Sequence, residues 1–87
     1  MKVIKINNLS HENKEIVYLR NYTGEALLEL YPGNIIEIKI SFIYEEKAHG
    51  APSIKINILD DLDYPLVPVI RSLKAFIEDL GKQGELN

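Results

Sequence analysis

The chain has 87 residues, a formal net charge of −3, and contents of 46% hydrophobic and 26% charged residues. These values fit one small globular domain and exclude a disordered chain. The absence of cysteine excludes a disulfide framework and thiolate chemistry. The sequence shows no basic face for a nucleic-acid backbone and no apolar run near the roughly 18 residues of a membrane span. Residues 1–8 contain no apolar leader. We therefore expect a cytoplasmic protein that binds neither nucleic acid nor membrane.

The first part of the chain predicts three short strands. Residues 2–6 and 15–20 are rich in strand-forming side chains, and the polar residues 7–14 between them are expected to be a loop. Residues 21–24, Asn-Tyr-Thr-Gly, have the composition of a turn. Residues 25–31 could form a helix by propensity, but they are few and end at a Pro-Gly pair. A strand that enters a tight turn is the preferred interpretation.

The clearest pattern in the sequence covers residues 35–45. Even positions there are apolar and odd positions are mostly polar, which is typical of a strand with one buried face. The inward positions are Ile36, Ile38, Ile40, Phe42 and Tyr44. Residues 53–59 repeat the alternation and predict an antiparallel return strand.

The last part of the chain predicts a helix. Its apolar positions recur every three or four residues: Leu66, Val69, Ile70, Leu73, Phe76, Ile77 and Leu80. Pro65 and Asp63 suit a helix start, and Gly81 is placed to end the helix in the left-handed conformation. We expect a single α+β domain over residues 1–81, followed by a flexible C-terminal tail over residues 82–87. Its four- to five-stranded antiparallel sheet, open or curled, packs one face against the C-terminal amphipathic helix.

No arrangement of residues in the sequence predicts catalysis or a cofactor. The few hydroxyl side chains have no glycine-flanked nucleophile elbow. Glu45 and Glu46 are adjacent in a strand end, so their side chains point to opposite faces. His11 and His49 fall in separate expected loops without further ligands, so neither predicts a zinc site. We therefore expect a protein that is not an enzyme.

The acidic segment Asp60-Asp61-Leu62-Asp63 allows two interpretations. Its carboxylates could bind a hard cation such as Ca²⁺ or Mg²⁺. However, the glycine and the late glutamate of a calcium loop are missing. The preferred interpretation is an acidic loop that caps the positive end of the following helix, with no metal.

A second set of apolar residues falls in the odd, mostly polar register: Val3, Leu27, Ile35, Ile43 and Leu59. Tyr18 or Leu19 must join them, depending on which way that strand faces. One helix covers only one face of a sheet, so these residues predict either an interface or a sheet curled enough to bury them.

Two functions compete on this pattern. The leading hypothesis is a small non-catalytic protein-interaction module, a homodimer whose contact surface contains these five odd-register residues. The alternative is a regulatory domain that binds a small ligand or a divalent metal. Its cleft would lie near the acidic loop and would be lined by tyrosines, namely Tyr22, Tyr31, Tyr44 and Tyr64.

Overall fold

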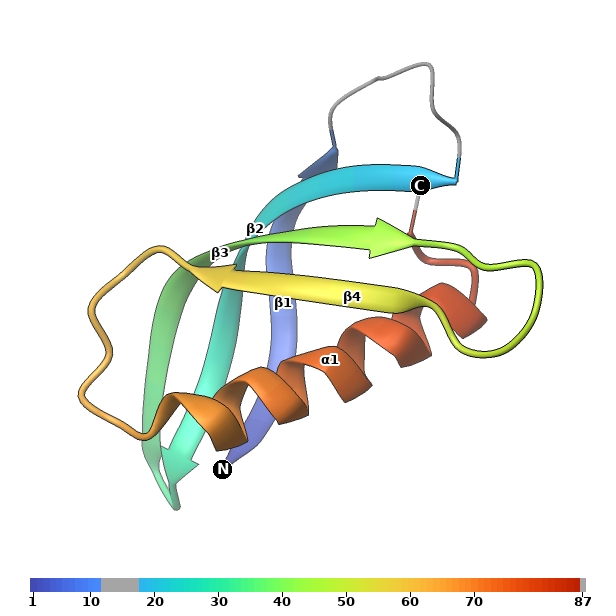
Figure 1. Ribbon diagram of the computed structural model, residues 1–87. Helices are drawn as coiled ribbons and strands as arrows, with labels where there is room; N and C mark the ends of the chain where they lie inside the picture. Colours follow the sequence, from blue (N-terminus) through green and yellow to red (C-terminus); the bar gives the residue numbers. More distant parts are fainter. Residues whose placement is uncertain (12–17, 87) are drawn as a thin grey trace.

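The computed structural model describes residues 1–11 and 18–86. It is an α+β fold in which four antiparallel strands form one open sheet in the order of the chain (Figure 1). The elements are β1 (Lys2–His11), β2 (Leu19–Tyr31), β3 (Asn34–Glu45), β4 (Ser53–Ile58) and α1 (Leu66–Lys82). The predicted fold class is confirmed, with four strands and a sheet that does not close.

The sheet has four strands because the turn expected at residues 21–24 does not form. This prediction was wrong: Asn21 to Gly24 pair in register with β3, inside the single strand β2. A Cβ built on Gly24 would lie 2.8 Å from Ile6 Cγ2 and 3.2 Å from the carbonyl oxygen of Asn7, so glycine is needed there for close approach of β1. The strand interpretation of residues 25–31 is confirmed. Residues 15–17 lie outside the described part.

Strand β1 is longer and less regular than predicted. It continues to His11, so residues 7–11 are not the expected loop, and residues 12–14 lie outside the described part. Its pairing with β2 shifts register between Val3 and Lys5, and again between Asn7 and Ser10. Asn8, within the second irregularity, has a φ of 53°. Such bulges bend a strand and change the face to which its side chains point.

The core lies between the even-numbered side chains of β2 and β3 and one face of α1. Its buried residues include Leu28, Ile38, Ile40, Phe42, Tyr44, Val69, Leu73 and Ile77. The predicted alternation of β3 is thus confirmed. The helix packs closest to the two edge strands, β1 and β4, so the sheet bends around it (Figure 1). The buried stripe of α1 is narrower than predicted, because Leu66 is 49% exposed.

Both ends of α1 differ from the sequence prediction. Pro65 occupies the N-terminal cap and no side chain caps the helix. The acidic-loop prediction was wrong in this respect: Asp60 Oδ2 instead accepts a 2.7 Å hydrogen bond from the amide of Lys39 on β3. Gly81 lies inside the helix.

The helix ends through Gly84 and not through Gly81. Gly84 has a φ of 73°. Its amide donates to the carbonyl of Gly81 at 3.1 Å, and the amide of Glu85 donates to the carbonyl of Leu80 at 2.9 Å. These are the two hydrogen bonds of a Schellman motif. The turn directs the chain back to the domain, where Leu86 is buried in the core cluster.

Candidate functional site

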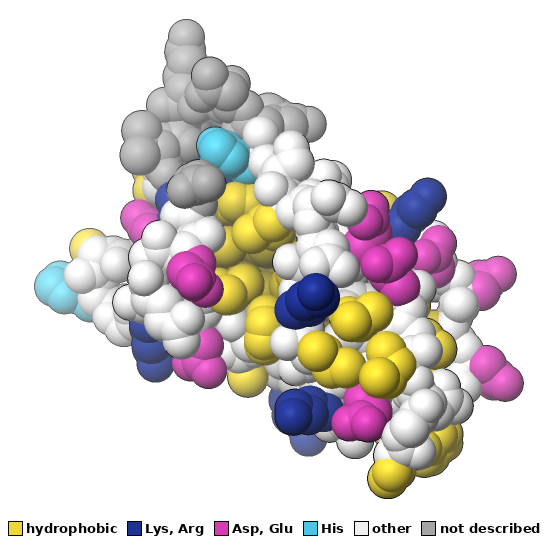
Figure 2. All heavy atoms as spheres, turned by 180° about the vertical axis from the view of Figure 1, so that it is seen from behind, with side chains coloured by type: hydrophobic (Ala, Val, Ile, Leu, Met, Phe, Trp, Pro, Cys, Tyr) yellow, Lys and Arg dark blue, Asp and Glu magenta, His cyan; other side chains and the backbone are white. Residues whose placement is uncertain are grey.

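The sheet face opposite α1, here called the helix-free face, carries most of the odd-register apolar residues. Ile35, Ile43 and Leu59 are 52%, 38% and 56% exposed, and Leu27 is half-buried. Leu59 follows β4 and donates its amide to the carbonyl of Lys39 at 2.9 Å. The sheet therefore does not curl enough to bury these side chains. Figure 2 shows the molecule from behind, with hydrophobic side chains reaching the surface among charged ones.

Val3 is not part of this group. The register shift after Val3 places it opposite the buried Leu28, and its side chain packs against the core. Of the two neighbouring candidates at the start of β2, the register places Leu19 on the helix-free face, opposite Glu45. The irregular pairing of β1 is the reason that counting odd positions failed for Val3.

The remaining apolar residues are spread along the face. Leu27 pairs with Glu37, and Ile35 pairs with Glu29, so Leu27 and Ile35 are diagonal neighbours across β2 and β3. Ile43 lies eight residues from Ile35 in the same strand, a separation of about 26 Å at ~3.3 Å per residue. Charged residues of both signs lie between and around them: Lys5, Lys39 and Lys55, with Glu25, Glu29, Glu37 and Glu45.

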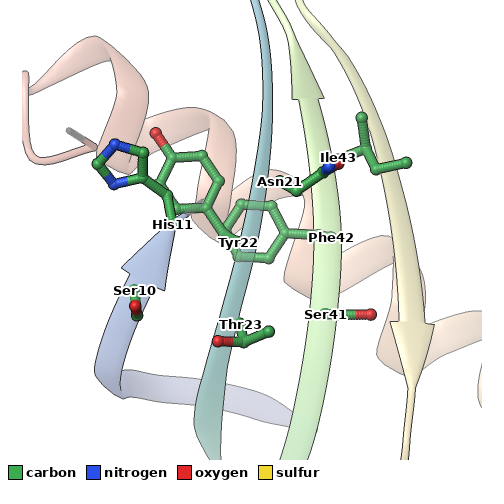
Figure 3. A pocket seen from close by; sticks show the side chains of 8 residues that line it. All are labelled: Ser10, His11, Asn21, Tyr22, Thr23, Ser41, Phe42 and Ile43. Carbon is green, nitrogen blue, oxygen red and sulfur yellow. The ribbon is translucent and has the colours of Figure 1, made fainter. Parts of the chain in front are cut away.

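A pocket of about 320 Å³ lies where β1, β2 and β3 run together, beside Ile43 (Figure 3). Its lining residues are Ser10, His11, Asn21, Tyr22, Thr23, Ser41, Phe42 and Ile43. Ser10 is the register partner of Thr23, and Thr23 is the partner of Ser41. The three hydroxyl side chains therefore form one row across three strands, which Figure 3 shows.

Stacked aromatic rings support this pocket from the core side of the sheet. The ring centroids of Tyr22 and Phe42 are 4.9 Å apart at an interplanar angle of 14°, and each residue is 2% exposed. The ring of His11 lies 5.5 Å from that of Tyr22. These contacts fix the wall because buried, stacked rings have little freedom to move.

Arg20 links this aromatic cluster to the end of α1. Its guanidinium carbon lies 5.3 Å from the ring centroid of Tyr44 and 6.0 Å from that of Tyr22. Its Nη2 forms a 2.8 Å ion pair with Glu46. The Nε of Arg20 is buried and has no hydrogen-bond partner in the described part of the chain.

Burial sets the ionisation of the two tyrosines in this cluster. It raises the pKa of Tyr22, and the positive charge of Arg20 opposes that rise. Burial also raises the pKa of Tyr44, and Glu46 adds to the effect. Both phenols are therefore neutral near physiological pH.

Sequence reasoning did not find the pocket or this cluster. A run of four apolar residues, 16–19, hid the alternation that Arg20 and Tyr22 continue. The only available signal was that strand spacing, together with the hydroxyls of Thr23 and Ser41.

The acidic loop and the tyrosines do not form the cleft of the alternative hypothesis. Tyr31 and Tyr64 contact each other edge-on, with centroids 5.7 Å apart. Tyr22 and Tyr44 are buried beside Arg20, at the other end of β2 and β3.

Neither a metal cluster nor a membrane helix was found where the structure could be searched. Across residues 1–11 and 18–86, no group of three or more His, Asp or Glu side chains is placed to hold a metal ion. His49 lies exposed between β3 and β4. Within the same described ranges, no helix combines the length and hydrophobicity needed to cross a membrane.

Comparison with known proteins assigns the chain to a family. The family model of the BB_0187 family matches residues 1–82, from the start of β1 to the last residue of α1. A search of curated proteins found no match, and a search of solved structures found none. Since the family match covers nearly the whole chain, this protein belongs to the BB_0187 family.

Proposed function

We propose that this protein is a small non-catalytic interaction module that associates with a second copy of itself through the helix-free face. One observation carries the proposal: Ile35, Ile43 and Leu59 remain between 38% and 56% exposed on the sheet face that α1 does not cover. Removal of apolar surface from water is favourable by ~25 cal/mol per Å². A partner on this face would gain that free energy.

The charges on the helix-free face favour a second copy as the partner. Three lysines and four glutamates alternate with the apolar residues there. In a two-fold dimer the same surface meets itself, so a face with both signs can pair lysines of one copy with glutamates of the other. A strongly charged partner would meet like charges on either side. The small size of the domain also leaves it a limited core, which a subunit contact would supplement.

The arrangement of the hydroxyl side chains supports the non-catalytic part of the proposal. Ser10 and His11 are adjacent in β1, so their side chains point to opposite faces of the strand. The residues that line the pocket include no carboxylate to orient the imidazole. A nucleophile activated by a positioned base needs both relationships.

Sedimentation velocity of the full chain from low to high micromolar concentration tests the proposal. We expect the sedimentation coefficient to rise with concentration as the dimer forms. Ile35→Glu and Ile43→Glu should each keep the protein monomeric, because each buries a charge in the contact. Val67→Glu is the matched control, since Val67 is 65% exposed on α1 and lies outside the proposed contact. A monomer at every concentration, with wild-type circular dichroism, would contradict the proposal.

A further inference from the structure

We propose that the pocket between β1, β2 and β3 binds a small neutral polyol of monosaccharide size. Its volume of about 320 Å³ lies at the lower end of the range of ligand sites, roughly 300–1,000 Å³. The inference goes beyond self-association, because it assigns a ligand class to a cavity that a dimer does not require.

The polar lining matches the hydrogen-bonding groups of a polyol. Five side chains with hydrogen-bonding groups line the pocket: Ser10, His11, Asn21, Thr23 and Ser41. A hydroxyl both donates and accepts, and an amide offers one group of each kind, so the lining suits ligand hydroxyls that also do both. The row from Ser10 to Ser41 places successive hydroxyls one strand spacing apart, about 4.8 Å. That spacing is comparable to the width of a pyranose ring.

The charge of the lining selects a neutral ligand. None of the eight lining residues is a lysine, arginine, aspartate or glutamate. A phosphate or a carboxylate would therefore lose hydration on entry without gaining a charged partner, which is costly.

The aromatic wall disfavours a planar base. Tyr22 and Phe42 stack on each other and are each 2% exposed, so neither ring offers a free face for stacking. Ile43, which is 38% exposed at the rim, instead provides an apolar contact for the C–H groups of a sugar.

Ile43 belongs both to the pocket and to the proposed dimer surface. Binding is therefore best measured in the Ile35→Glu variant, where the substitution lies about 26 Å along β3 from Ile43. In this background a failure of sugar binding and a failure of self-association are separate results.

Two-dimensional NMR of the ¹⁵N-labelled full chain tests the inference, with D-glucose, D-galactose and N-acetyl-D-glucosamine added in turn. We expect saturable shifts of the Thr23 and Ser41 amides with at least one sugar. Thr23→Val keeps the shape of the side chain and removes the hydroxyl, and Ser41→Ala removes the next hydroxyl in the row. Each should weaken binding about tenfold, because each leaves a ligand hydroxyl without its partner.

Ser53→Ala is the control, because Ser53 is a β4 hydroxyl outside the pocket lining and should leave the dissociation constant unchanged. Adenine and glucose 6-phosphate test the other ligand classes. The absence of saturable shifts with all three sugars would overturn the inference. Tighter binding of adenine or glucose 6-phosphate, or equal binding by both hydroxyl variants and the control, would also overturn it.

Discussion

The ring of Tyr44 on β3 lies directly against Gly81 in the last part of α1. A Cβ at position 81 would lie 2.9 Å from Cζ of Tyr44, closer than side chains normally approach. Tyr44 is only 5% exposed, so its ring has little room to withdraw. Glycine inside a helix costs roughly 0.5–1 kcal/mol relative to alanine. Here that cost is offset by close packing of the helix on the sheet.

Gly81→Ala should therefore destabilise the domain although alanine favours helix. We expect a loss of about 1–3 kcal/mol in the free energy of unfolding, as for other overpacked core sites. Urea denaturation followed by circular dichroism measures it. Lys74→Ala, at an exposed position of the same helix, should change stability by less than about 0.5 kcal/mol. Added to Tyr44→Leu, the alanine should cost less than in the wild type. A Gly81→Ala variant more stable than the wild type would show that the ring yields.

The face of α1 that meets the sheet should dominate stability. Leu73 is fully buried, and Leu73→Ala is expected to cost about 2–5 kcal/mol through lost burial and the cavity that remains. Leu73→Asp, like Ile38→Asp on the opposing strand, should unfold the domain. Val67→Ala on the outward face of the same helix should stay within about 0.5 kcal/mol of the wild type. Thermal melts of the four variants give the comparison, and equal melting temperatures for Leu73→Ala and Val67→Ala would contradict the packing described above.

Alkaline pH should destabilise the domain through its buried tyrosines. The pKa of Tyr44 is raised chiefly by burial and further by Glu46, while Arg20 lowers it. The folded state thus keeps the phenolic proton at pH values where the unfolded chain has lost it. Stability is fully present below the unfolded pKa of about 10 and falls as pH rises toward the folded pKa.

Urea denaturation between about pH 8 and pH 11 measures this effect. Tyr44→Phe should show a shallower fall in stability than the wild type. Some fall should remain, because the pKa of Tyr22 is raised by burial in the same way. Parallel pH profiles for the wild type and Tyr44→Phe would exclude a contribution from this phenol.

The parts of the fold that could be predicted are those where one local rule acts without competition. In β3, β-branched and aromatic residues alternate with polar ones, and the even residues are buried as expected. In α1, Val69, Leu73 and Ile77 follow helical spacing and are buried. Neither pattern depends on contacts from distant parts of the chain, so each is visible in the sequence.

Glycine was the main source of error, because its local meaning depends on distant contacts. Gly24 follows two turn-prone residues, yet its role is to let Ile6 and Asn7 of β1 approach β2. Gly81 and Gly84 are equally plausible helix terminators in the sequence. The choice falls on Gly84 because Tyr44, from another element, occupies the space beside Gly81.

The pocket could not have been predicted for a related reason. Its hydroxyl row joins Ser10 to Ser41 through Thr23. That alignment depends on the register shift between Asn7 and Ser10, which includes the positive φ of Asn8. Bulges of this kind are set by the pairing of two strands and leave little trace in either strand alone.

The packing of α1 against both edge strands has a consequence for synthesis of the chain. The sheet is translated first, and its core face has no intramolecular cover until residues 66–82 have left the ribosome. During that interval the nascent chain exposes aliphatic side chains and two strand edges, the features that promote aggregation. Folding is therefore completed only near the end of translation, and premature termination before Leu66 would release a species that depends on chaperones to stay in solution.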